Sequence, residues 1–151
     1  MAQVLVPAVV ALFIIWLFLA ARRGSRIDVA LIGSDLVVRL RGVDVLWTFR
    51  RRVTVSVDLV RGVAVSSLAA VPTHGLRLPG IAIPGVIRAG SYGTGNDRSF
   101  WDVRRGPEIL WVELVDGAPY RRLILEVPDP HELALRLRPH LGAWVPQEWQ
   151  A

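Results

Sequence analysis

The sequence predicts a mainly β domain that is preceded by a single transmembrane helix and closed by one C-terminal α-helix. Three observations support this fold class. A long uncharged apolar run lies near the N-terminus, apolar and polar residues then alternate along most of the chain, and apolar residues recur every four positions near the C-terminus. Alternation is typical of half-buried strands, whereas the wider spacing is typical of an amphipathic helix.

The apolar run extends from Val4 to Ala21 and contains no charged residue. As a helix it would be about 27 Å long, close to the ~30 Å hydrocarbon core of a bilayer. Pro7 lies near its start, where a missing backbone N–H has little cost. A cleaved secretory signal is the alternative, but Met1-Ala2-Gln3 carries no basic residue and Arg22-Arg23 directly follow the run. These features favour a retained anchor.

Arg22, Arg23 and Arg26 follow the predicted helix, and no basic residue precedes it. Positively charged flanks stay in the cytoplasm. We therefore expect a single-pass protein of the cell (inner or plasma) membrane, with its N-terminus outside and its domain in the cytoplasm. The expected organisation is a helix with its basic flank over residues 1–23, one domain over 24–142 and a C-terminal tail over 143–151.

Composition limits the function classes. The 151 residues suit one domain beyond the anchor, and the chain has no cysteine for disulfides or thiolate metal sites. All 18 basic residues are arginine, and the net charge of +5 is mild. No nucleic-acid-binding motif accompanies this charge, so we expect no nucleic-acid partner.

Turn residues divide the central part of the chain into about seven expected strands in antiparallel order. Thr73–Ile83 is rich in Gly and Pro, so it is expected to be a loop or an irregular edge strand. Asp116-Gly117 predicts a tight hairpin. The expected strands are Ile27–Ile32, Leu36–Leu40, Val53–Asp58, Val63–Ser66, Arg98–Val103, Ile109–Val115 and Tyr120–Val127, and Val86–Tyr92 also suits a strand.

The C-terminal helix is predicted to begin after Asp129, which serves as the N-cap, with Pro130 at the first helical position. Glu132 is placed to complete a capping box. Leucines recur every four residues from Leu133 to Leu141, and Gly142 favours the end of the helix.

Several segments also carry a family resemblance. They are Leu46–Arg52, Val60–Val63, Gly75–Gly80, Ile83–Gly85, Phe100-Trp101 and Asp129-Pro130. Through them the chain from Ile27 to Leu141 resembles bacterial pleckstrin-homology-like (PH-like) domains. The resemblance implies an open barrel capped by the C-terminal helix, which serves as a binding or scaffolding unit. It implies no catalytic residue.

Ser91 lies in Ala89–Gly93, within one residue of a serine-hydrolase nucleophile elbow. That motif needs a sharp strand-to-helix turn, whereas a loop follows here, so a glycine-rich strand end is favoured. The alternative function is a small membrane-tethered enzyme or enzyme subunit, hydrolase-like, that uses the Pro/Gly loop. Its residues would be His74, Arg77 and Ser91.

Metal and acid–base chemistry find little support in the sequence. His74, His131 and His140 lack the paired spacing of metal ligands, so no metal and no cofactor are expected. The pairs Glu108/Glu113 and Asp97/Asp102 are expected to be solvated carboxylates rather than a general acid and base.

The candidate binding residues are basic or aromatic. Arg22, Arg23 and Arg26 would flank the membrane, while Arg50, Arg51 and Arg52 form the densest basic run of the domain. This run either contacts lipid or a partner or is plain surface. Trp101 and Trp111 are expected in the core, Trp47 in the core or partly exposed, and Trp144 and Trp149 in interfacial or partner contact. The expected function is a membrane-anchored, non-catalytic PH-like interaction module that binds a protein partner or anionic lipid headgroups.

Overall fold

The computed structural model describes residues 2–22, 27–42, 45, 48, 50–71, 77–83 and 87–141. Within these ranges it leaves undescribed the side chains of residues 2–5, 17, 18, 20–22, 77–81 and 83. The expected residues Arg23, Arg26, Trp47, Trp144 and Trp149 therefore lie outside the described part of the chain.

The described elements follow one another as one N-terminal helix, nine strands and one C-terminal helix, with four short 3-10 turns. The helices are α1 (Ala2–Arg22) and α3 (Pro130–Leu137). The strands are β1 (Ile27–Ile32), β2 (Asp35–Leu40), β3 (Arg52–Ser56), β4 (Val60–Ser67), β5 (Arg77–Ile83), β6 (Ile87–Tyr92), β7 (Ser99–Val103), β8 (Glu108–Leu114) and β9 (Arg122–Leu125). The 3-10 turns are η1 (Val57–Leu59), η2 (Leu68–Ala70), η3 (Gly95–Asp97) and η4 (Arg138–His140).

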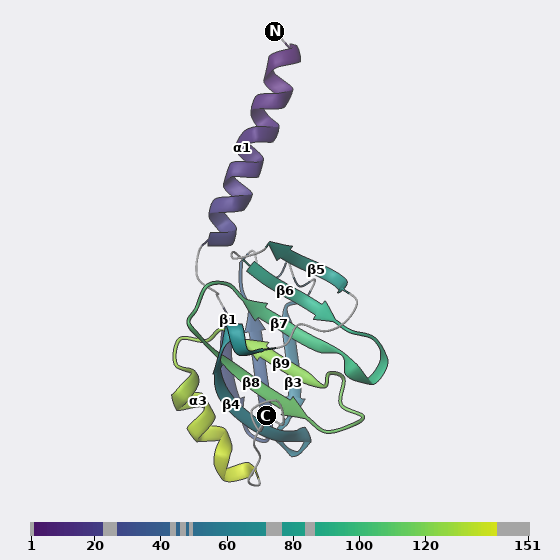
Figure 1. Ribbon diagram of the computed structural model, residues 1–151, viewed down its shortest axis with the longest axis vertical. Coiled ribbons are helices and arrows are strands. Elements are labelled where there is room, and N and C mark those ends of the chain that lie inside the picture. The colour runs from purple at the N-terminus through teal and green to yellow at the C-terminus, as the bar shows by residue number, and fades with distance from the viewer. Residues whose placement is uncertain are drawn as a thin grey trace.

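The strands form two separate sheets, so within the described residues they close no barrel (Figure 1). One sheet has three strands in the order β1-β2-β3, and the other has six in the order β4-β8-β9-β7-β6-β5. All neighbours are antiparallel except β7 and β9, which are parallel.

The expectation of about seven antiparallel strands is therefore wrong in number and in one pairing. The hairpin at Asp116-Gly117 is confirmed, because β8 pairs with β9 and Gly117 has a φ of 91°. β9 lies between β8 and β7 in the sheet. After β7 the chain therefore leaves one strand position open, forms β8 beyond it, and returns as β9 to fill the open position. Turn residues predict which strands form hairpins, but they carry no information about such an insertion.

The Pro/Gly-rich segment contains a strand where the sequence allowed a loop or an irregular edge. β5 is the edge of the six-stranded sheet and pairs only with β6 among the described strands. Its register shifts between Arg77 and Gly80, on either side of Pro79. An edge position tolerates a proline that lacks a donor, because one side of the strand has no ladder to complete.

The main core lies between the two sheets and α3. On β2, Leu36, Val38 and Leu40 face this core, as the alternation predicts. The six-stranded sheet contributes Phe100, Leu110, Val112, Leu123 and Leu125. These are alternate residues of their strands, so the same sheet face is buried throughout.

The opposite face of the six-stranded sheet has a second apolar cluster. Trp101 and Trp111 are 4% and 1% exposed, which confirms the core positions expected for them. The other buried members are Val71, Val103, Ile109 and Ile124. Two buried faces explain why several central strands contain nearly continuous apolar sequence.

The start of α3 is as predicted in one respect and different in another. The Asp129 side chain accepts a hydrogen bond of 2.8 Å from the backbone N–H of Glu132, which confirms the N-cap. The capping box is wrong, because the Glu132 carboxylate instead pairs with Arg136 one turn later. Residues four apart lie next to each other on a helix surface, so the exposed carboxylate and guanidinium meet there.

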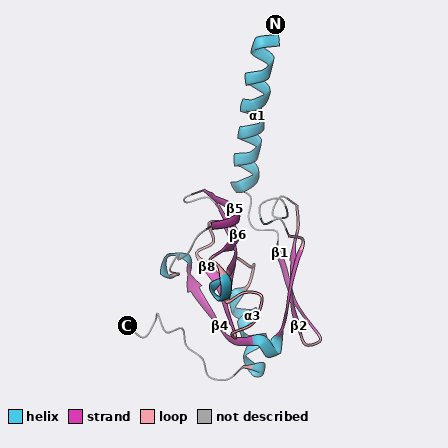
Figure 2. Cartoon of the chain, turned by 90° about the vertical axis from the view of Figure 1, so that its right-hand side faces the viewer, coloured by secondary structure: helices cyan, strands magenta, loops and turns pink. Residues whose placement is uncertain are grey.

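The N-terminal segment is a helix, as expected, and α1 extends away from the domain (Figures 1 and 2). Its described apolar side chains are exposed, with Val6 and Leu12 both at 66%. Phe13 and Trp16 stack on each other, with ring centroids 6.0 Å apart. No helix in the described part of the chain is both long and apolar enough to cross a membrane.

Candidate functional site

One end of the three-stranded sheet lies next to α1. β1 begins at this end, and the register of Ile27 with Leu40 and of Arg39 with Arg52 shows that β2 ends and β3 begins there too. Four residues separate the end of α1 from the start of β1. At ~3.5 Å per residue this connection is short. Figures 1 and 2 both show α1 leaving the domain at this end, where β5 also lies.

This α1-proximal end is strongly basic. Residues 39–52 contain five arginines and one acidic residue, Asp44. Arg50, Arg51 and Arg52 are exposed. Asp28 on the neighbouring strand pairs with Arg41 at 3.4 Å, and both side chains are largely exposed. The basic run Arg50–Arg52, for which the sequence left open lipid or partner contact and plain surface, is therefore grouped with two further arginines at one end of the sheet.

The opposite end of the same sheet has the opposite charge. Asp35 begins β2 at that end, and Asp58 follows β3 in η1. A strand of five to six residues separates these carboxylates from the arginines. The three-stranded sheet thus has a positive end beside α1 and a negative end away from it.

Arg50 also takes part in a cluster around Tyr120, a residue that is only 3% exposed. The Cζ atom of Arg50 lies 5.8 Å from the centroid of the Tyr120 ring, and that of Arg98 lies 5.6 Å from it. The edge of Phe100 meets the same ring, with centroids 5.6 Å apart. Two guanidinium groups therefore lie over one buried aromatic ring, an arrangement that cation–π attraction stabilises.

Hydroxyl groups complete this arginine–tyrosine cluster. The Tyr120 hydroxyl lies 3.4 Å from Oγ of Ser91, which is itself buried. The Thr48 hydroxyl donates a hydrogen bond of 3.1 Å to the backbone carbonyl of Arg50 and so orients that residue. The Nε atom of Arg98 is buried and has no hydrogen-bond partner among the described residues.

In a neighbouring charged cluster the arginines and carboxylates pair with one another. The Glu113 carboxylate accepts hydrogen bonds of 3.0 Å from Trp111 Nε1 and from Arg121 Nε, and lies 3.3 Å from Arg122 Nε. Arg121 also pairs with Asp116. The hydrogen bond to Glu113 and the nearby carboxylates raise the pKa of Arg121 above its ordinary value, so this guanidinium stays charged. The expectation that Glu113 is a solvated carboxylate is therefore wrong, as it is for Asp102, because both side chains are buried.

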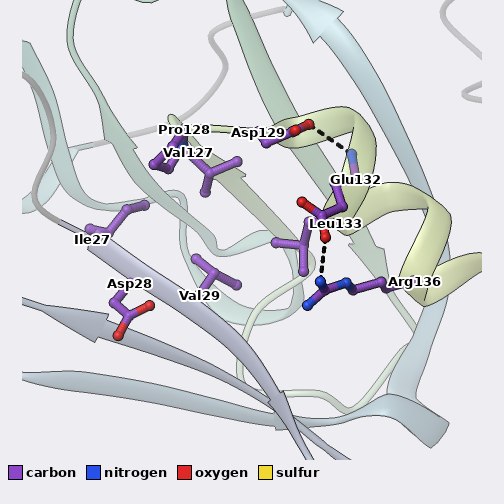
Figure 3. Close-up of a pocket in the computed structure, with 9 residues that line it drawn as sticks. All are labelled: Ile27, Asp28, Val29, Val127, Pro128, Asp129, Glu132, Leu133 and Arg136. Carbon is purple, nitrogen blue, oxygen red and sulfur yellow. Dashed lines mark hydrogen bonds and ion pairs between the residues drawn. The ribbon is translucent and has the colours of Figure 1, made fainter.

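A cavity of about 210 Å³ lies between β1 and the start of α3 (Figure 3). Asp28 lies on the β1 side of this cavity, and Glu132 and Arg136 lie on the α3 side. It is smaller than common ligand pockets, and its charged groups already have partners. The lining residues are Ile27, Asp28, Val29, Val127, Pro128, Asp129, Glu132, Leu133 and Arg136. We do not assign a function to it.

The residues of the alternative hydrolase do not form a described catalytic site. Ser91 lies within β6, and its hydroxyl contacts Tyr120. The backbone of Arg77 pairs with Tyr92 at the end of β6, and His74 lies outside the described residues. His131 contacts Glu108 at 3.3 Å on the surface. Among the described residues no three His, Cys, Asp or Glu side chains group as metal ligands.

Sequence reasoning missed Arg98 and Tyr120. They come from the connections before β7 and β9, and they meet Arg50 and Ser91 from two other parts of the chain. No local spacing links these segments, so no sequence signal identifies the cluster. Comparison with protein-family models, curated proteins and solved structures finds no match to this chain.

Proposed function

We propose that this chain is a membrane-anchored, non-catalytic interaction module that lies on the cytoplasmic face of the cell membrane. Its basic end contacts anionic lipid headgroups. The observation that carries the proposal is the juxtaposition of an exposed apolar helix with an arginine-rich end of the domain. A protein partner is the alternative contact for this basic end, and protein-free vesicles distinguish it from lipid.

The exposure of α1 supports an apolar environment for this helix. Five consecutive residues, Leu12–Trp16, are each between 50% and 66% exposed. Consecutive residues lie 100° apart around a helix, so these five cover every side of it. A helix that is apolar all round is stable only when lipid or protein surrounds it. α1 has 21 residues, and we propose that the whole apolar run Val4–Ala21, rather than its described residues alone, forms the anchor.

The charge distribution supports lipid headgroups as the contact. Anionic lipids attract basic residues by about 1 kcal/mol each within a Debye length of the surface. The positive end lies beside α1, and Asp35 and Asp58 lie at the far end, so the attraction and the anchor act in the same direction. The resemblance to PH-like domains contributes only a strand-rich core with a C-terminal helix. The parallel pair of β7 and β9 differs from the antiparallel order expected for that family.

Protease protection of the full chain tests the anchor and its orientation. In inverted membrane vesicles, added protease is expected to digest the domain and leave a fragment containing α1. In right-side-out vesicles the domain is expected to resist until detergent is added. Protection of the domain in inverted vesicles would contradict the orientation, and its release by a salt wash from vesicles would contradict the anchor. If a protein partner rather than lipid binds the domain, the domain will not bind to vesicles of anionic lipid that contain no other protein.

A further inference from the structure

We infer that the arginine–tyrosine cluster is a binding site for a phosphate group carried by an anionic lipid headgroup. Arg50 and Arg98 would bind the phosphate oxygens, with the ring of Tyr120 holding both guanidinium groups in place. This inference rests on the proposed function, because the anchor brings the domain to the headgroups. It adds a defined ligand group and the residues that bind it.

The charges of Arg50 and Arg98 are not balanced within the described part of the chain. Arg121 and Arg122 bind the nearby carboxylates of Glu113 and Asp116. Arg50 and Arg98 have no ion pair with any described residue, although each lies within 6 Å of the same ring centroid. No described carboxylate therefore balances the charge of either guanidinium group. A bound phosphate would supply the missing counter-charge.

Arg98 also carries an unsatisfied hydrogen-bond donor. Nε of Arg98 is buried and lacks an acceptor among the described residues. A buried N–H without a partner is costly, and native proteins rarely leave one. An oxygen of a ligand bound beside Tyr120 would supply the acceptor. Phosphate suits the site because its oxygens match the planar fork of donors on a guanidinium group.

Both arginines are held in place before any ligand binds. Arg50 is exposed, yet its guanidinium lies on a ring that is itself fixed by Phe100 and by Ser91. Long arginine side chains lose rotamer freedom when they bind a ligand. Because ring contacts already restrict both arginines, part of this loss occurs on folding rather than on binding.

Calorimetry on the full chain in dodecyl maltoside micelles tests the inference. The probes are dihexanoyl phosphatidic acid, dihexanoyl phosphatidylcholine, glycerol phosphate and inorganic phosphate, each corrected with empty micelles. We expect dihexanoyl phosphatidic acid to bind at least tenfold more tightly than the other three. Equal binding of inorganic phosphate would assign the site to free phosphate and overturn the lipid source.

The variant Arg50→Gln/Arg98→Gln is expected to weaken binding of dihexanoyl phosphatidic acid at least tenfold. The control Arg61→Gln/Arg138→Gln removes the same charge from exposed positions outside the cluster and is expected to change binding less than twofold. Arg50→Lys/Arg98→Lys keeps the charge but loses the fork, so severalfold weakening is expected. Equal losses in the two glutamine variants, or no binding by the natural chain, would overturn the site.

Two features keep this test decisive. Arg50→Gln alone alters an exposed side chain, so it preserves folding if the double variant does not, and it should weaken binding about threefold. Binding in micelles does not depend on membrane insertion. If the chain binds phosphatidic acid but fails the protease test, the phosphate site stands and the proposed anchor is contradicted. If the chain passes the protease test but does not bind phosphatidic acid, only the phosphate site is contradicted.

Discussion

Replacing Leu12 and Ile15 together with arginine is expected to release the full chain from membranes. Both residues lie in the middle of the uncharged run Val4–Ala21 and are exposed on α1. An arginine at the centre of a spanning helix raises the insertion free energy by about 2.5–3.5 kcal/mol. The two changes therefore cost about 5–7 kcal/mol, enough to shift partitioning by more than a thousandfold.

Carbonate extraction of membranes measures this effect. The natural chain is expected in the pellet and the Leu12→Arg/Ile15→Arg variant in the supernatant. The control Leu12→Ile/Ile15→Leu conserves apolar character at the same positions and is expected to stay in the pellet. If the arginine variant also stays in the pellet, α1 does not hold the chain in the bilayer.

Glu113→Gln is expected to destabilise the domain by about 2–3 kcal/mol. The Glu113 carboxylate is buried, and it receives hydrogen bonds from Trp111 and Arg121 and an ion pair from Arg122. A glutamine of the same size offers one neutral oxygen to the two hydrogen-bond donors, removes the charge that pairs with Arg122 and brings an N–H₂ group towards all three residues. Donors that lose a charged acceptor in a partly buried site are left desolvated without compensation.

Thermal unfolding of the full chain in dodecyl maltoside, followed by near-ultraviolet circular dichroism, measures this loss. A decrease in Tm on the order of 5–10 °C is expected for Glu113→Gln. The matched control is Glu108→Gln on the same strand, since Glu108 is exposed and pairs with His131 on the surface. Its effect should stay within about 0.5 kcal/mol. Equal decreases in the two variants would contradict the structural role of Glu113.

Local patterns predicted much of the fold. The alternation on β2 placed Leu36, Val38 and Leu40 correctly in the core, and Asp129 was correctly identified as the cap of α3. Both signals depend on residues within one turn or one strand. The insertion of β9 between β8 and β7 depends instead on packing between distant segments, which no short pattern encodes.

The candidate site was predicted only in part. The run Arg50–Arg52 is visible in the sequence as a dense group of charges, but the role of each arginine depends on the residues that surround it in the fold. Arg50 is distinguished from its neighbours by its place over Tyr120, and Arg98 joins it from the connection before β7. Sequence spacing cannot show which of the three adjacent arginines has a special environment. The Tyr120 ring that distinguishes Arg50 from the other two lies about 70 residues further along the chain.

The depth of single spin labels in lipid vesicles tests the central claim most directly. The chain has no cysteine, so Leu12→Cys, Arg51→Cys and Asp58→Cys each carry one label at an exposed position. The account predicts that the label at 12 lies near the bilayer centre, the label at 51 near the phosphates and the label at 58 in water. A water-accessible label at 12, or labels at 51 and 58 equally far from the surface, would contradict it.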